Sequence, residues 1–197
     1  MADNKIKVGF AVCGSFCTFS TVFDEIENLL NLGFDVTPIM SFNAASLDTR
    51  FGKASDHIQY LETICKKTVI KTIEDAEPIG PKKMFDIVVV APCTSNTLAK
   101  LAVGITDTPV TMAVKSHIRN MRPVVIAPST NDALGAAAKN IGTLRNYKNY
   151  YFVPIQQDDC IKKPNSMVAD FSMLYNTIIS ALSGVQIQPI IKQKPPI

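Results

Sequence analysis

Short runs of apolar residues alternate along this chain with stretches in which apolar residues recur every three or four positions. The first pattern is typical of buried strands and the second of amphipathic helices. It predicts strands at residues 5–12, 34–40, 85–90, 109–114, 123–128 and 150–154. It predicts helices from about residue 18 to 31, at 55–67, after Thr97, at 133–139 and at 167–182, and a loop at 74–83.

The regular alternation of strand and helix predicts an α/β fold. We expect a single domain over residues 1–197, with one doubly wound, Rossmann-like parallel sheet between two helical layers, as in flavodoxin-like three-layer proteins. Residues 186–197 contain three prolines and are predicted to form an extended C-terminal tail.

Composition narrows the class of protein. Apolar residues make up 47% of the chain and charged residues 19%, which is typical of a globular protein. The net charge of +3 comes with no basic stripe for nucleic acid, and no apolar run is long enough to span a membrane. The first residues lack the apolar core of a signal peptide, so we expect a cytoplasmic protein. Five cysteines and two histidines show no paired metal-ligand spacing, so we expect reduced thiols and no metal.

Small polar residues follow several predicted strands. The segment 91–100 (APCTSNTLAK) places Thr94, Ser95 and Asn96 between a strand and a helix. Other strands end in Gly14-Ser15, in Ser41 and in Ser129-Thr130-Asn131. Each could be an ordinary turn or helix cap. Because such strand ends meet at one edge of an open sheet, together they predict a polar, nearly uncharged pocket for a heteroaromatic ring with one phosphate.

Other motifs leave alternatives open. The first strand–helix turn has neither the Gly-x-Gly-x-x-Gly pattern nor a Walker loop. Lys115 and Arg119 lie in a basic cluster that is either a solvated helix face or a contact for a phosphate or dicarboxylate. Cys13 and Cys93 flank the predicted pocket, as reactive thiols or as buried inert ones. His57 is predicted to be a packed or surface histidine on a helix.

The residues Gly14-Ser15, the segment 91–100 and the segment 104–107 (GITD) resemble the flavin-containing cysteine decarboxylase superfamily, over about residues 5–185. The resemblance implies bound FMN and a homo-oligomer with FMN near the subunit contacts. Two departures argue against cysteine decarboxylation. Residues 77–81 contain no histidine where the decarboxylases have a catalytic one, and residues 128–131 keep an asparagine but lose the family's methionine.

A narrower resemblance is to the family of dipicolinate synthase B subunits. It rests on residues 78–83, 115–123, 129–132, 157–158 and 163–166. It implies oxidation of a dihydrodipicolinate-type intermediate to dipicolinate in the mother cell of a sporulating bacterium. It also implies a partner A subunit that binds NADP.

The resemblance also implies roles for individual residues. Gly14 and Ser15 would hold the FMN phosphate, assisted by Ser41 and Lys115. The flavin ring edge and ribityl chain would lie against Cys93, Thr94, Ser95, Asn96 and Thr97. As candidate catalytic residues, Asn131 would face the substrate and Arg119 would pair with a substrate carboxylate. No residue is predicted as a general base. Two alternatives therefore stay open, namely a non-catalytic subunit that positions the A subunit and a flavin prenyltransferase or flavin reductase.

Overall fold

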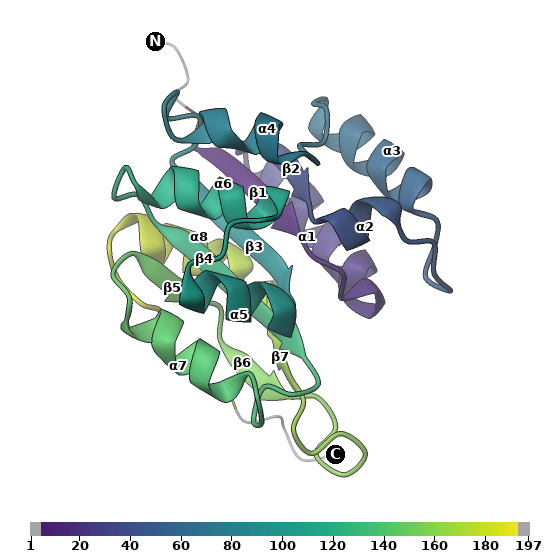
Figure 1. The fold of residues 1–197 in the computed structure, drawn as a ribbon, viewed down its shortest axis with the longest axis vertical. Helices are drawn as coiled ribbons and strands as arrows, with labels where there is room; N and C mark the ends of the chain where they lie inside the picture. Colours follow the sequence, from purple (N-terminus) through teal and green to yellow (C-terminus); the bar gives the residue numbers. More distant parts are fainter. Residues whose placement is uncertain (1–4, 193–197) are drawn as a thin grey trace.

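A sheet of seven strands organises the part of the chain that this computed structural model describes, residues 5–192 (Figure 1). Five strands run parallel in the order β2-β1-β3-β4-β5, and β7 and β6 continue the sheet beyond β4 as an antiparallel pair. The strands are β1 Lys7–Val12, β2 Asp35–Met40, β3 Ile87–Cys93, β4 Val124–Thr130, β5 Tyr150–Phe152, β6 Ile155–Gln157 and β7 Met167–Ala169.

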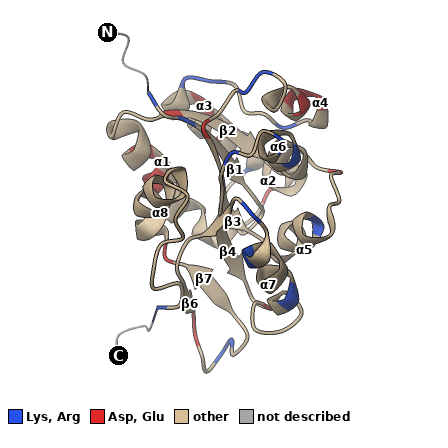
Figure 2. Cartoon of the chain, turned by 90° about the vertical axis from the view of Figure 1, so that its left-hand side faces the viewer, with Lys and Arg blue, Asp and Glu red and all other residues tan. Residues whose placement is uncertain are grey.

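Helices cover both faces of this sheet. Figure 2 shows α1 and α8 on one side of the strands and α5, α6 and α7 on the other, where α4 packs on α6. Helix α3 packs against β2 and α1 at the sheet edge, and α2 packs on α3. The helices are α1 Phe19–Asn31, α2 Phe42–Ser46, α3 Ala54–Cys65, α4 Ile73–Ala76, α5 Ser95–Val103, α6 Pro109–Ile118, α7 Ala138–Asn146 and α8 Leu174–Leu182, with 3₁₀ turns η1 Phe16–Thr18, η2 Glu77–Ile79 and η3 Phe171–Met173. The predicted three-layer Rossmann-like fold is confirmed.

The central strands are buried along their whole length. All seven residues of β3 are buried, as are the first six of β4. Continuous runs of valine and isoleucine suit strands that helices cover on both faces, because neither face meets water. This is why the apolar runs of the sequence predicted these strands correctly.

The segment predicted as a strand at residues 109–114 is instead the start of helix α6. Thr108 and Thr111 form a reciprocal capping box at its N-terminus, and Pro109 occupies the first helical turn. The helix is buried on most sides, because it lies between the sheet and α4. A short apolar run in a helix that is buried on most sides has the same sequence pattern as a buried strand, which explains the wrong prediction.

The end of the chain contains more strand than predicted. Residues 167–182 form β7, η3 and α8 rather than one helix, and the alanine-rich segment is in turns until α7 begins at Ala138. The predicted loop at 74–83 contains the short helix α4 and the turn η2. An all-parallel sheet is correct for β1 to β5, but β7 runs antiparallel to both β4 and β6.

Strand β4 changes partners along its length, and this change shapes the site. Its first half pairs with β5 through Ile126, and its end pairs with β7 at Ser129 and Thr130. Pro128, which lies between the two halves, cannot donate a backbone hydrogen bond. The loop between β6 and β7 therefore lies beside the end of β4.

Residues 190–192 of the predicted tail lie beside β6, where Ile191 forms a parallel bridge with Ile155, and the Gln186 side chain bonds to the backbone of Phe152 in β5. Residues 193–197 lie outside the described part of the chain. Within residues 5–192, no helix is long and apolar enough to cross a membrane. The same residues contain no group of three or more His, Cys, Asp or Glu side chains that could hold a metal ion.

Candidate functional site

A polar pocket of about 500 Å³ lies at the carboxyl ends of β1, β3 and β4. The arrowheads in Figure 1 show β3 and β4 ending side by side, next to the start of α5 and the β6–β7 hairpin. Its lining residues are Gly14, Ser15, Cys17, Thr18, Thr94, Ser95, Asn96, Ser129, Thr130, Asn131, Asp158, Lys163, Ser166, Met167 and Val168. Three of the predicted strand ends therefore meet in one cavity.

The turn after β1 forms the first wall of the polar pocket. Ser15 donates its backbone N–H to the Cys13 carbonyl at 2.8 Å, and its own carbonyl accepts from both the N–H and the hydroxyl of Thr18. The Ser15 hydroxyl lies 2.9 Å from that of Ser129, which ties the end of β1 to the end of β4.

Gly14 has no side chain in a place where the fold would accept one. A Cβ built there would meet its nearest neighbours, Phe16 and Asn43, at ordinary contact distances of 3.4 and 3.5 Å. Packing therefore does not require glycine at this position. The missing side chain instead leaves the backbone of the pocket wall open to a ligand.

The N-terminus of α5 forms the second wall. Thr94 is the N-cap residue, but its side chain makes no capping hydrogen bond and contacts the Thr97 hydroxyl instead, at 3.4 Å. The first N–H groups of a helix have no partner within the helix, and the helix dipole makes this end attractive to negative charge. Ser95 and Asn96, in the first turn, line the pocket. This wall can bind an anion or the polar edge of a ring.

Asp132 holds two walls of the pocket together, a role that the sequence analysis missed. Its carboxylate accepts hydrogen bonds from the Ser95 hydroxyl at 2.9 Å and from the Thr130 hydroxyl. The start of α5 is thereby fixed to the end of β4. The signal in the sequence was a short acidic side chain directly after the Ser-Thr-Asn segment, where such residues commonly bond to nearby groups.

The β6–β7 hairpin supplies the third wall and, within residues 5–192, the only lysine or arginine that lines the pocket. Lys163 donates to the Asp158 carboxylate at 2.8 Å, and this hydrogen bond raises the pKa of Lys163, which is therefore a cation at neutral pH. Ser166 donates to the Asn131 side-chain oxygen at 3.3 Å, so Asn131 lies in the pocket as predicted. The sequence analysis did not place Lys163 in the site, because it did not predict the hairpin.

Three predicted cofactor contacts lie outside the pocket lining. Ser41 accepts a hydrogen bond from the Ala44 N–H and caps α2. Cys93 and Thr97 are buried behind the lining, where the Thr97 hydroxyl lies 3.3 Å from the Cys13 sulfur. Burial raises the pKa of Cys13 to about 11 and that of Cys93 well above its usual range. Both thiols are therefore protonated at neutral pH, as expected of inert buried cysteines.

The two predicted basic contacts are on α6, away from the pocket of the same chain. Lys115 lies 3.4 Å from the Thr106 hydroxyl, and Arg119 is the C-cap residue of α6. Arg119 packs beside Gly80, where α6 approaches so closely that a Cβ on Gly80 would lie 2.2 Å from the Ser116 carbonyl oxygen. Neither residue lines the polar pocket.

The donor set of this pocket fits a phosphate-bearing ring. Hydroxyls from three strand ends, the start of a helix, an open glycine backbone and one lysine can bind a single phosphate and the polar edge of a ring. The fold and the site together define a Rossmann-like protein with a polar pocket at the switch point of its sheet, which is where open α/β sheets bind nucleotide-type cofactors. Comparison with known proteins then names the family. Residues 1–183 match the model of the flavoprotein family, and this chain belongs to that family.

Individual relatives agree with this assignment. The dipicolinate synthase B subunit of Bacillus subtilis (strain 168) is 47% identical over 185 residues, which cover 94% of this chain and 92% of the relative. The crystal structure of the dipicolinate synthase B subunit from Bacillus halodurans superposes with a TM-score of 0.88 at 42% identity, over 96% of this chain and 97% of the other. DmrB of Burkholderia xenovorans in complex with FMN has a TM-score of 0.66 at 18% identity, over 92% and 97% of the two chains, and shows the shared fold. Membership of the family supports flavin binding.

Proposed function

We propose that this chain is the FMN-binding B subunit of a dipicolinate synthase, and that it contributes to oxidation of a dihydrodipicolinate-type intermediate to dipicolinate in the mother cell of a sporulating bacterium. The polar pocket carries the proposal, because it brings Gly14, Ser15 and the start of α5 to one cavity. A sequence identity of 47% to a dipicolinate synthase B subunit, over 94% of this chain and 92% of the relative, supports the reaction.

FMN, when bound, supplies a ring that accepts the electrons removed from the substrate. The chain's own groups bind and orient. The Gly14 backbone and the Ser15 hydroxyl take the phosphate, and the first turn of α5 takes the ring edge and ribityl chain. Asn131 faces the substrate. The Lys163 ammonium pairs with one carboxylate of the diacid, in place of the pairing predicted for Arg119 within one chain.

Lys115 and Arg119 take their predicted roles only in the pocket of a neighbouring copy. A homo-oligomer would bring α6 of one chain to the polar pocket of the next. DmrB, which is described as a cubic protein cage for redox transfer, supports assembly of this fold into larger particles. The proposed hetero-partner is the A subunit, with NADP bound to it.

A second candidate is a non-catalytic subunit that positions the A subunit. One observation favours it: Asp158 and Lys163 are the only carboxylate and amine groups among the described lining residues, and they are paired with each other. The pocket therefore offers no evident general base. In that case the redox step belongs to the A subunit.

Reconstitution separates the two candidates. The purified chain should be yellow, or should take up FMN one to one and show the flavin absorption band. Dipicolinate formation should then require both subunits, FMN and the nicotinamide cofactor. A colourless chain that cannot take up FMN contradicts the flavin site. Full activity of the A subunit alone contradicts the catalytic contribution.

A further inference from the structure

A second cavity, of about 400 Å³, lies between α1 and α3 next to the polar pocket, with which it shares Cys17. Six of its ten lining residues carry rings, and two carry carboxylates. We call it the aromatic cavity. Its rings are those of Phe16, Phe19, Phe23, Phe51, His57 and Tyr60.

Five of the six rings form a continuous wall. The Phe16 and Phe19 centroids are 5.1 Å apart, those of Phe19 and Phe23 are 5.3 Å apart, and Tyr60 stacks on Phe23 at 5.5 Å. His57 meets Phe19 edge-on at 5.0 Å. These separations lie in the range in which aromatic rings attract each other, so the wall is preorganised.

His57 belongs to this wall as a neutral ring. Gly52 covers it, with a φ of +133° that favours glycine and with space for no Cβ, which would lie 2.7 Å from the imidazole. Burial lowers the pKa of His57 below its usual value of 6.5, so the ring is neutral at pH 7. It therefore adds an aromatic surface and no positive charge.

The charge at this cavity is negative. Asp24 of α1 and Asp56 of α3 line it, and neither forms an ion pair with another described residue. Helix α1 also carries Glu25 and Glu27 and contains no lysine or arginine, so its exposed side is acidic in Figure 2. A ligand in this cavity meets aromatic rings and two carboxylates that form no ion pair with a described residue, and the Arg50 guanidinium at the rim lies over the Phe51 ring.

This combination recognises organic cations. Aromatic faces attract an ammonium or guanidinium group, and cages of several rings are the recurring site for alkylated ammonium ions. The rim already shows the interaction within the chain, because the Arg50 guanidinium carbon lies 4.8 Å from the centroid of the Phe51 ring. The volume is also in the range of small-molecule sites. We propose that the aromatic cavity binds a small organic ammonium ion, independently of the flavin.

Calorimetric titration of the full chain with choline tests this proposal. The matched ligand is 3,3-dimethylbutan-1-ol, which has the same shape and no charge. Choline should bind saturably and at least about tenfold more tightly than the alcohol, with or without FMN. Absence of saturable choline binding, or equal affinity for the neutral ligand, would overturn the proposal. Because FMN is not needed, failure of the flavin proposal would leave this result unchanged.

A charge variant locates the binding. The double substitution Asp24→Asn with Asp56→Asn should weaken choline binding by roughly fivefold or more, because it removes both carboxylates and leaves the rings. The matched control is Glu74→Gln with Glu77→Gln, which removes two exposed carboxylates, one in α4 and one in η2, and should leave the affinity unchanged. Equal weakening in both variants would assign the effect to net charge and would contradict the site.

Discussion

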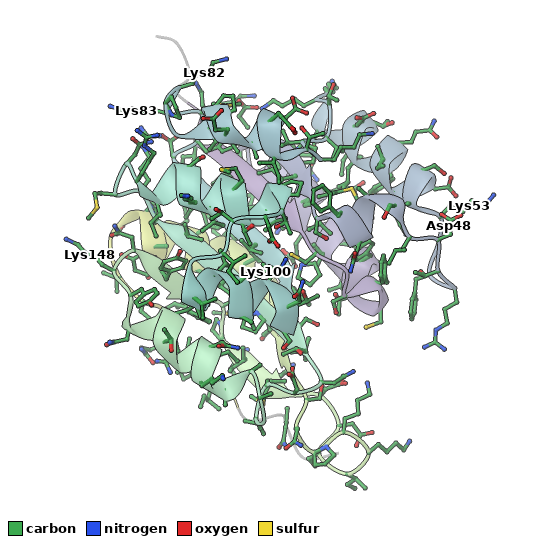
Figure 3. All side chains as sticks on the ribbon, in the orientation of Figure 1. Asp48, Lys53, Lys82, Lys83, Lys100 and Lys148 are labelled. Atoms are coloured by element: carbon green, nitrogen blue, oxygen red, sulfur yellow. The ribbon has the colours of Figure 1, made fainter. Side chains whose placement is uncertain are left out.

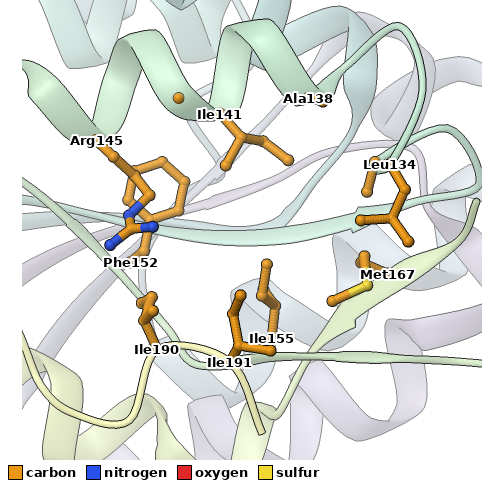
Figure 4. A pocket seen from close by; sticks show the side chains of 11 residues that line it. Leu134, Ala138, Ile141, Arg145, Phe152, Ile155, Met167, Ile190 and Ile191 are labelled. Atoms are coloured by element: carbon orange, nitrogen blue, oxygen red, sulfur yellow. The ribbon is translucent and has the colours of Figure 1, made fainter.

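Two pockets meet at Met167 and differ in their chemistry. The polar pocket, of about 500 Å³, is lined largely by hydroxyl, amide and charged groups. The apolar pocket, of about 220 Å³, lies between α7 and the segments around Phe152, Ile155 and Ile191, and Arg145 is the only ionisable residue among its described lining residues (Figure 4). Polar residues line the first mainly from loops and element ends, whereas apolar residues line the second largely from within helices and strands.

The difference separates ligand binding from stability. Packing does not require the small side chains of the polar pocket, since a Cβ on Gly14 would meet its neighbours only at ordinary contact distances. Residues of the apolar pocket such as Phe152 and Ile141 belong to the hydrophobic core. Substitutions in the polar pocket should therefore change ligand affinity, and substitutions in the apolar pocket should change the free energy of unfolding.

The largest effect is expected in the apolar pocket, from Phe152→Ala. Phe152 is only 1% exposed, and its loss should lower the free energy of unfolding by about 3–5 kcal/mol. Leu134→Ala is the control, because Leu134 lines the same pocket but is 53% exposed, and it should cost less than about 1 kcal/mol. Urea denaturation measures both. A loss for Phe152→Ala as small as the one expected for Leu134→Ala would show that the apolar pocket is not an extension of the core.

Acid should weaken the fold without removing the cation of the polar pocket. Burial lowers the pKa of His117 to about 4, although its Nε2 lies 3.1 Å from the Pro123 carbonyl oxygen. In the unfolded chain the His117 ring takes up a proton at higher pH than in the folded chain. The contribution of neutral His117 to the free energy of unfolding is therefore complete above about pH 6.5 and is lost as the pH falls towards 4. The loss reaches about 3 kcal/mol for His117, and His57, whose pKa is also lowered, adds to it.

Urea midpoints between pH 7 and pH 4 measure this loss. The variant His117→Asn should show a shallower pH dependence than the native chain, whatever its stability at pH 7. An identical pH dependence in both proteins would mean that His117 is accessible to protons in the folded state.

Asp132→Ala should affect both binding and stability, because Asp132 joins two walls of the polar pocket. Without its carboxylate, the hydroxyls of Ser95 and Thr130 lose their acceptor. FMN affinity should fall about tenfold, and the free energy of unfolding should fall by about 1–2 kcal/mol. Fluorescence titration and urea denaturation measure the two effects. A loss of stability with full FMN affinity would place FMN elsewhere.

The smallest effect is expected from Lys163→Gln, which removes a cation at an exposed rim. Affinity for a pyridine dicarboxylate should fall roughly fivefold, and the difference should shrink as salt is added. Lys148→Gln is the matched control, because Lys148 points away from the protein in Figure 3. If Lys148→Gln weakens binding equally, the effect comes from net charge and not from the polar pocket.

The sequence predicted the parts of the fold in which local pattern and tertiary environment agree. The buried runs of β1 to β4 and the amphipathic pattern of α1 gave those elements correctly. The prediction of a strand at residues 109–114, where α6 begins, was wrong because burial on most sides removes the periodicity that distinguishes a helix from a strand. The pair β6 and β7 was missed because its strands are three residues long, and pairing between distant segments has little local signal.

The candidate site was predictable to a similar extent. Gly14, Ser15, Thr94, Ser95, Asn96 and Asn131 line one pocket, because the ends of parallel strands necessarily meet at one edge of a sheet. Lys163 could be placed in the site only from the path of the β6–β7 hairpin, and Asp132 only from the direction of its side chain. No local sequence pattern contains either kind of information. Charge and the family resemblance placed Lys115 and Arg119 in the site, but Lys115 lies in the last turn of α6 and Arg119 is its C-cap residue, and neither lines the polar pocket.

FMN affinity of the variant Asn96→Ala tests the central claim most directly. Asn96 lines the polar pocket on the first turn of α5 and is exposed, so its loss should not disturb the fold. Fluorescence titration should give a dissociation constant about tenfold higher than that of the native chain, because a ring edge in the pocket loses a hydrogen-bond partner. Asn146→Ala, at the exposed end of α7, should bind FMN as the native chain does. An unchanged dissociation constant for Asn96→Ala would contradict the assignment of the polar pocket to the flavin.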